Sequence, residues 1–213
     1  MEKLSTQRRE LLKNQTARYH QNLADSPAQD YLAERGLLGV NDEKLNQLRL
    51  GYVPSEVNVY GGMLSIPYLR RHPRHGWGCV SMRYRNLNGD KPKYLTEPGD
   101  RPRIYNTVAL TTPSPVVGIT EGEIDAISAT LAGLPTVGIP GVNAWEPYWS
   151  AMFLGYERVF IFTDGDEPGR NFGKKLAGQL PNASVIHLPD GEDVNSVLVN
   201  SGAEGVKDLW QTQ

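Results

Sequence analysis

The second half of the chain alternates short apolar runs with longer stretches of mixed polarity. The apolar runs are rich in β-branched and aromatic residues and span residues 116–120, 135–139, 158–163 and 184–188. Such runs, each bounded by turn residues, are typical of buried strands in a parallel sheet. Helices are expected between and after them, over residues 124–132, 145–153, 168–180 and from 194 onward. Strand–helix alternation predicts parallel pairing with right-handed crossovers.

The first half has a different pattern. It predicts three helices, over residues 3–24, 28–35 and 42–48, followed by strand-like segments at 64–69, 78–84 and 93–95. Asn88-Gly89-Asp90 is a tight-turn signal between two of these segments, which indicates a small antiparallel or mixed sheet. The Pro-rich stretch 111–115 marks the expected boundary between a mixed α+β subdomain (residues 1–112) and an α/β domain (113–213).

Composition narrows the class of protein. A hydrophobic content of 39% over 213 residues supports a packed core, and no apolar stretch is long enough to span a bilayer. The first ten residues lack the apolar segment of a secretory signal. Cys79 is the only cysteine and there are four histidines, so neither an internal disulfide nor a thiolate zinc site is expected. These features favour a cytoplasmic protein without zinc or a membrane partner.

The charges are unevenly distributed along the chain. Residues 67–105 contain nine basic and three acidic residues, a net charge of +6, whereas residues 110–213 contain thirteen acidic and five basic residues, a net charge of −8. A basic half beside an acidic half is the balance expected where a polyanion is held next to a metal site. Two solvated surfaces of opposite sign would explain the same distribution.

Acidic clusters follow three of the expected strands. They are Glu121-Gly122-Glu123-Ile124-Asp125, Asp164-Gly165-Asp166 and Asp190-Gly191-Glu192-Asp193. Ligands of open α/β sheets bind beyond the carboxyl ends of the strands, so these carboxylates are expected to converge. Gathered carboxylates repel one another unless a cation or a shared proton relieves them, and Mg²⁺ or Mn²⁺ there would handle phosphate groups. Taken singly, Asp125 and Asp193 are also explained as favourable charges or caps at helix N-termini.

These motifs together resemble the Toprim domain of bacterial primases, topoisomerases and some nucleases. Within that family, the sequence resembles DnaG-type primases most closely in three segments. These are Glu121-Gly122-Glu123-Ile124-Asp125, residues 164–170 and Leu188-Pro189-Asp190-Gly191-Glu192-Asp193. The resemblance implies that Glu121, Asp164 and Asp166 are catalytic and that they bind Mg²⁺ together with Asp193. Asp125, Asp190 and Asn195 would support this shell. The family often has an Asp where this chain has Asn195; the amide oxygen would still coordinate, more weakly.

Upstream segments extend the resemblance to about residues 28–213. Asp90-Lys91-Pro92-Lys93-Tyr94-Leu95-Thr96 resembles the primase segment that leads into a basic ridge, and 31–37 and 50–54 resemble the start of the catalytic core. The implied DNA-binding residues are Arg83, Arg85, Lys91, Lys93, Arg101 and Arg103. Tyr84 and Tyr94 offer aromatic faces, although packing in the small sheet explains them better. The zinc-binding and helicase-docking modules of these primases have no counterpart in this sequence, which suggests a bare catalytic core: either an excised domain or a small primase of phage or plasmid type.

The resemblance implies a DNA-directed RNA polymerase, a nucleotidyltransferase that makes short RNA primers from NTPs on single-stranded DNA with Mg²⁺. A replicative helicase and a separate zinc-binding module are possible partners, in the host cytoplasm if the gene is a phage gene. Two alternatives stay open: a Toprim-type nuclease using the same metal cluster, and a non-catalytic DNA-binding or replisome module. A topoisomerase is disfavoured because the chain is short for a further domain carrying a nucleophilic tyrosine.

Overall fold

The computed structural model describes residues 4–72 and 76–211, which divide into two compact units. The first unit ends at Arg101 but leaves out the segment Arg35–Asn41. That segment belongs to the second unit, which otherwise begins at Pro102. We expected one boundary, between residues 112 and 113; the compact units divide upstream of it. Of the helices within the described ranges, none is both long and apolar enough to cross a membrane.

The first unit is built on a four-stranded antiparallel sheet of order β1-β2-β3-β4. Its elements are α1 (Thr6–Gln21), α2 (Pro27–Glu34), α3 (Asp42–Gln47), β1 (Gly51–Tyr52), β2 (Leu64–His72), β3 (Gly76–Arg85) and β4 (Tyr94–Thr96). Helix α1 packs on β3 through Leu12 and Tyr19, which meet Met82 and Tyr84. Gly51 brings β1 against the backbone of α1, where any side chain would overlap Tyr19.

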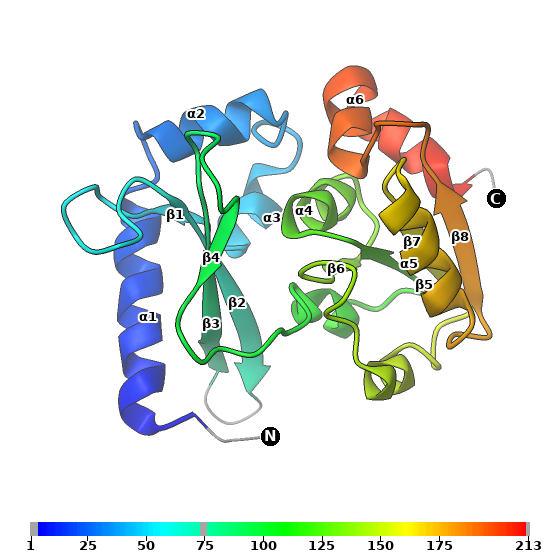
Figure 1. Ribbon diagram of the computed structural model, residues 1–213, viewed down its shortest axis with the longest axis horizontal. Helices are drawn as coiled ribbons and strands as arrows, with labels where there is room; N and C mark the ends of the chain where they lie inside the picture. The colour runs from blue at the N-terminus through cyan, green and yellow to red at the C-terminus, as the bar shows by residue number, and fades with distance from the viewer. Residues whose placement is uncertain (1–3, 73–75, 212–213) are drawn as a thin grey trace. The chain divides into compact units, whose positions relative to one another are not determined.

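The second unit is an α/β domain with a four-stranded parallel sheet of order β6-β5-β7-β8 (Figure 1). Its elements are η1 (Thr107–Thr111), β5 (Val116–Thr120), α4 (Glu123–Leu131), β6 (Thr136–Gly138), η2 (Pro147–Met152), β7 (Arg158–Thr163), α5 (Glu167–Ala177), β8 (Ala183–His187) and α6 (Val194–Gln211). The expected α/β class and parallel pairing are confirmed. From β5 the chain moves to β6 at one edge of the sheet, and from β7 it moves to β8 at the other edge. The topological switch point therefore lies between β5 and β7.

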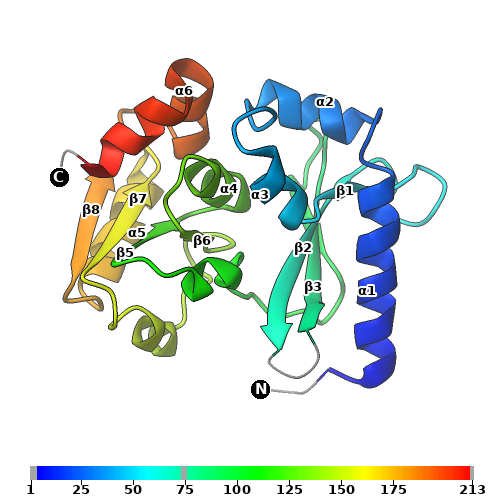
Figure 2. The same ribbon diagram turned by 180° about the vertical axis from the view of Figure 1, so that it is seen from behind.

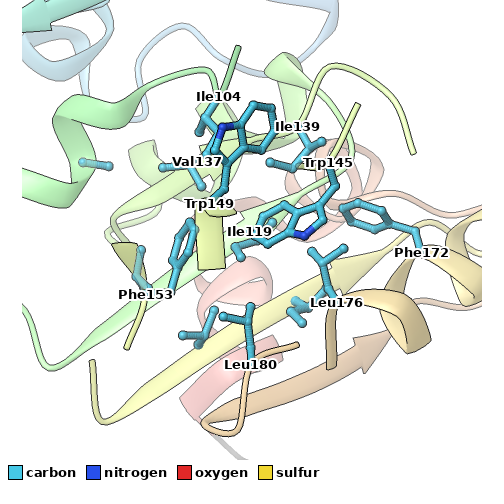
Figure 3. Close-up of a cluster of buried hydrophobic side chains, with 14 residues drawn as sticks. Ile104, Ile119, Val137, Ile139, Trp145, Trp149, Phe153, Phe172, Leu176 and Leu180 are labelled. Carbon is cyan, nitrogen blue, oxygen red and sulfur yellow. The ribbon is translucent and has the colours of Figure 1, made fainter. Parts of the chain in front are cut away.

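One cluster of buried apolar side chains in this unit lies on one face of the sheet. Figure 3 shows Trp145, Trp149 and Phe153 gathered with Phe172 and Leu176 of α5. Strand residues at alternating positions, Val117, Ile119, Val159 and Ile161, complete the cluster, and all four are fully buried. Helix α4 packs instead against α6 and β6, so helices flank the sheet on both faces (Figure 2). This packing fixes the carboxyl ends of β5 and β7 beside each other.

Candidate active site

The first acidic residue of the site follows β5. Beyond Thr120 the half-buried Glu121 reaches across to β7, where its Oε1 accepts a hydrogen bond from the backbone N–H of Asp164 at 3.1 Å. Gly169, in the first turn of α5, makes room for this contact: a Cβ there would lie 2.7 Å from Glu121 Oε1. The two strand ends that flank the switch point are therefore joined through a carboxylate.

The Asp164-Gly165-Asp166 turn connects β7 to α5. Asp166 is the N-cap of α5, and its Oδ1 accepts from the backbone N–H of Gly169 at 2.7 Å. Gly165 donates to the carbonyl of Glu192 at 2.9 Å and accepts from the N–H of Gly191 at 3.1 Å. A side chain at position 165 would overlap the carbonyl oxygen of Pro189. Backbone hydrogen bonds at this glycine thus hold the loop after β7 against the loop after β8.

The third acidic segment begins α6. Asp193 Oδ1 accepts from the backbone N–H of Ser196 at 2.7 Å, so Asp193 caps the helix. The Ser196 hydroxyl donates to Glu192 in turn. Asp190 lies outside this arrangement: its side chain is 95% exposed and pairs with Arg170 at 3.3 Å. Asp193 is thus fixed at the start of α6, whereas Asp190 lies on the surface.

Asp125 and Asn195 form a buried connection between α4 and α6. The backbone N–H of Asn195 donates to Asp125 Oδ1 at 3.0 Å. The Asn195 side-chain amide donates to Ser128 Oγ at 3.0 Å and to the carbonyl of Arg35 at 2.8 Å, while its Oδ1 accepts from Arg35 Nη1 at 3.2 Å. The oxygen that we expected to face a cation therefore faces a guanidinium. Arg35 and Ser128, its partners, were not anticipated from the sequence.

The pKa values show that these carboxylates share one region. The pKa of Glu121 is raised to about 7, mainly by burial and also by the charges of Asp166 and Asp125, while the hydrogen bond from the N–H of Asp164 lowers it. The pKa of Asp125 is also raised, first by burial and then by Asp193 and Asp164. Each of the five carboxylates is therefore close enough to influence another. An uncompensated negative cluster at a switch point favours a bound proton or a cation.

The donor atoms suit a hard divalent cation, because Mg²⁺ and Mn²⁺ prefer carboxylate oxygens. Asp166 and Asp193 each give one oxygen to a helix cap and retain a second. As the side chains lie, however, no three His, Cys, Asp or Glu residues in the described ranges are placed to hold one ion together. The residues fit a magnesium site chemically, and their side chains would have to turn toward the ion.

The first unit carries a separate group of expected DNA-binding residues. Arg83 lies over the Tyr94 ring, 4.3 Å from its centroid, and Arg85 lies 5.1 Å from it and donates to the Tyr94 hydroxyl at 2.6 Å. Arg85 also lies 4.9 Å from the ring of Tyr31 and is only 7% exposed. Arg85 therefore belongs to the stack itself, while Arg83 is partly exposed beside it.

The remaining residues of this group lie nearer to solvent. Lys91, Lys93 and Arg101 are exposed, and Arg103, which belongs to the second unit, is partly buried. Tyr84 is fully buried and stacks on Tyr60 at 3.9 Å, so the expectation that it packs in the sheet is confirmed. Its hydroxyl donates to Glu97, which also pairs with Arg8 at 2.6 Å. These contacts fasten the segment after β4 to α1.

Known proteins resemble this chain in sequence and in fold. The Toprim-like family model matches residues 118–198, which include the last three residues of β5 and the whole of β7 and β8, with the acidic segments that follow them. The Gene 57 protein of Mycobacterium phage D29 is 53% identical over 148 residues, which is 70% of this chain and 97% of that protein.

Solved structures resemble nearly the whole chain. A DNA primase domain from Pseudomonas aeruginosa matches 96% of this chain and 78% of its own length, with a TM-score of 0.78 and 21% identity. The DnaG primase catalytic domain bound to single-stranded DNA matches 95% of this chain and 77% of its own length, with a TM-score of 0.75 and 19% identity. At these identities the likeness establishes the fold, which is that of a DnaG catalytic core.

Proposed function

We propose that this chain, which belongs to the protein family of the Gene 57 protein of Mycobacterium phage D29 and has the fold of a DnaG catalytic core with a Toprim-like domain, is a primase catalytic core. It would join ribonucleotides on a single-stranded DNA template. The observation that supports the proposal is that Glu121, Asp164, Asp166, Asp125 and Asp193 lie close enough for each to influence the charge of another, with the pKa values of Glu121 and Asp125 raised.

In the reaction, a 3′-hydroxyl attacks the α-phosphate of an incoming NTP, the new P–O bond forms as the bond to pyrophosphate breaks, and the hydroxyl proton leaves. Asp164, Asp166, Asp193 and Glu121 would hold Mg²⁺, which when bound offsets the charge that develops on the phosphate oxygens. Glu121 would either help to hold the metal or accept the hydroxyl proton; without metal, burial raises its pKa to about 7, which suits proton transfer near neutral pH.

Two residues have positioning roles in this proposal. Asp125 adds negative charge beside Asp164 and Asp193 and is held by the backbone of Asn195. Asn195 is not proposed as a ligand, since its amide oxygen accepts from Arg35. The Arg35 guanidinium beside it disfavours a cation at that corner. We therefore place the metal on the side of Glu121 and Asp164.

The template would be held by phosphate contacts of Arg83, Lys91 and Lys93, with Arg101 and Arg103 contributing. Such contacts position the strand with little dependence on its sequence. The Tyr94 ring, stacked with Arg83 and Arg85, would keep the Arg83 guanidinium in one orientation and so lower the cost of binding. A replicative helicase and a zinc-binding protein that recognises the initiation site are proposed partners.

The test is synthesis on single-stranded DNA with labelled NTPs and Mg²⁺ or Mn²⁺. Asp164→Asn combined with Asp166→Asn is expected to abolish RNA products while leaving DNA binding intact. The fold should persist because Asn at position 166 still caps α5. Glu146→Gln combined with Glu157→Gln removes two exposed charges from the same unit and serves as the matched control.

Three outcomes discriminate between the candidate functions. RNA products that disappear in the Asp164/Asp166 variant support the primase proposal. Cleavage of the DNA strand instead of RNA synthesis, with the same dependence on both residues, would identify a nuclease. Full synthesis by the double variant would remove these residues from the mechanism, and binding without any reaction would favour a non-catalytic module.

A further inference from the structure

The outer part of the β2–β3 hairpin combines an exposed aromatic ring with an exposed cation. Trp77 is 54% exposed, and Arg71, its directly opposed partner on β2, is also exposed. Directly opposed residues of an antiparallel pair point to the same face with their Cβ atoms about 5 Å apart. Figures 1 and 2 show the two strands side by side along their length. The ring and the guanidinium stem therefore share one patch.

No adjacent side chain stands beside Trp77 along β3. Its two neighbours are Gly76 and Gly78, which have no side chains. Arg70, the residue opposite Gly78, is partly exposed but points to the other face of the hairpin, because side chains alternate along a strand. The cation that shares a face with the indole is therefore Arg71, and neither Gly76 nor Gly78 places a side chain beside the ring.

The charge around the patch selects the class of ligand. Between Glu56 and Asp90 the sequence contains no acidic residue, while it contains five arginines. A polyanion is favoured over a protein surface of mixed charge, because the segment offers no acid to pair with the partner's cations. An exposed indole adds a preference for unpaired bases, whose flat faces are available for stacking only when the strand is single.

We propose that Trp77 and Arg71 form a contact site for single-stranded nucleic acid, in which the indole stacks on one base and the guanidinium binds a neighbouring phosphate. This site is distinct from the Arg83 and Lys93 surface, since Trp77 precedes Arg83 by six residues, roughly 20 Å along an extended strand. The Trp77 site would lengthen the stretch of single-stranded nucleic acid that the first unit contacts. The site binds without metal or nucleotide and so can be tested apart from primer synthesis.

The experiment measures the anisotropy of a labelled oligothymidine titrated with the full chain, in EDTA and without NTPs. Trp77→Leu keeps the apolar bulk but removes the aromatic face, and it is expected to weaken binding about tenfold without changing the salt dependence. Trp77→Phe keeps an aromatic face and should bind close to wild type. Arg71→Ala should weaken binding and reduce the slope of log affinity against log salt by about 0.7.

Two control variants match these changes elsewhere. Tyr148→Leu removes a 70% exposed ring in the second unit, and Arg18→Ala removes an exposed cation from α1. Wild-type affinity in Trp77→Leu would overturn the proposal, as would an equal dependence of duplex binding on Trp77. Primer synthesis failing while the Trp77 effects hold would refute the proposed function alone; synthesis succeeding without any Trp77 effect would refute this site alone.

Discussion

At the scale of single residues, the sequence shows which carboxylates follow the expected strands, but it could not predict which hydrogen bonds each side-chain oxygen makes. Glu121, Asp164 and Asp166 stand directly after apolar strands, and that pattern needs only local information. The bond from Asn195 to Arg35 joins residues 160 positions apart, so no local signal announces it. Asp193 lies between these cases. The sequence allowed it either to cap a helix or to bind a metal, and in the structure it caps α6.

Glu121 gives rise to a pH dependence of stability in metal-free protein. Its pKa in the folded chain, about 7, exceeds the ordinary value of 4.5, so folding favours the protonated form. The stability from this group is fully present below the unfolded pKa and is lost as pH rises through the folded pKa. Asp125, whose pKa is raised as well, acts in the same direction. We expect the melting temperature in EDTA to fall between about pH 5 and about pH 8.

Glu121→Gln should flatten this decline, because the amide keeps an oxygen for the Asp164 N–H but does not ionise. Mn²⁺ should raise the melting temperature of the wild type more at pH 8 than at pH 6. Glu157→Gln, an exposed acid of the same unit, is the control and should retain the wild-type slope. A Glu121→Gln profile parallel to the wild type would show that another group titrates.

At the scale of elements, local composition located the strands and missed the short or irregular pieces. The buried runs at β5 and β7 have the bounds that were expected, because β-branched and aromatic residues end at turns there. Residues 145–153 were expected to be helical; within them Pro147–Met152 forms a helix, and it is a 3₁₀ helix. A six-residue stretch gains few i→i−4 hydrogen bonds, so burial of Trp149 and Phe153 decides its form.

Gly165 is the element-scale position on which the candidate site most depends. Gly165→Ala would place a Cβ against the backbone of Pro189, and a backbone atom cannot move aside by rotation. The loops after β7 and β8 must then separate, which should cost about 1–3 kcal/mol of stability and move Asp193 away from Asp164. Thermal melting with a Mn²⁺ titration measures both effects.

The matched substitution is Gly155→Ala, where a Cβ would meet no atom within 4 Å. It should leave both the melting temperature and the Mn²⁺ response near wild type. If Gly165→Ala melts lower but responds to Mn²⁺ as the wild type does, the two loops need not be adjacent for metal binding. A normal melting temperature would indicate that the backbone can adjust at low cost.

At the scale of the whole molecule, the sequence has a basic first part and an acidic second part, and the structure divides into two compact units. The boundary was expected at a Pro-rich stretch, since such composition is typical of linkers. The segment Arg35–Asn41, in which Leu37 is fully buried, joins the second unit through the hydrogen bonds between Arg35 and Asn195. Composition could not predict that this segment belongs to the second unit, because only its tertiary contacts place it there.

The proposed use of that charge distribution can be tested on two exposed lysines of the first unit. Lys91→Ala combined with Lys93→Ala should weaken binding of single-stranded DNA and reduce the slope of log affinity against log salt by about 1.4, since each phosphate contact contributes about 0.7. Lys174→Ala combined with Lys175→Ala removes the same charge from two exposed lysines of α5 and is the matched control. A general field effect would change both slopes equally, because total charge falls by the same amount in each variant. Only a direct contact of Lys91 and Lys93 with DNA would make the two slopes differ. Equal slopes for the two double variants would therefore remove Lys91 and Lys93 from the template path.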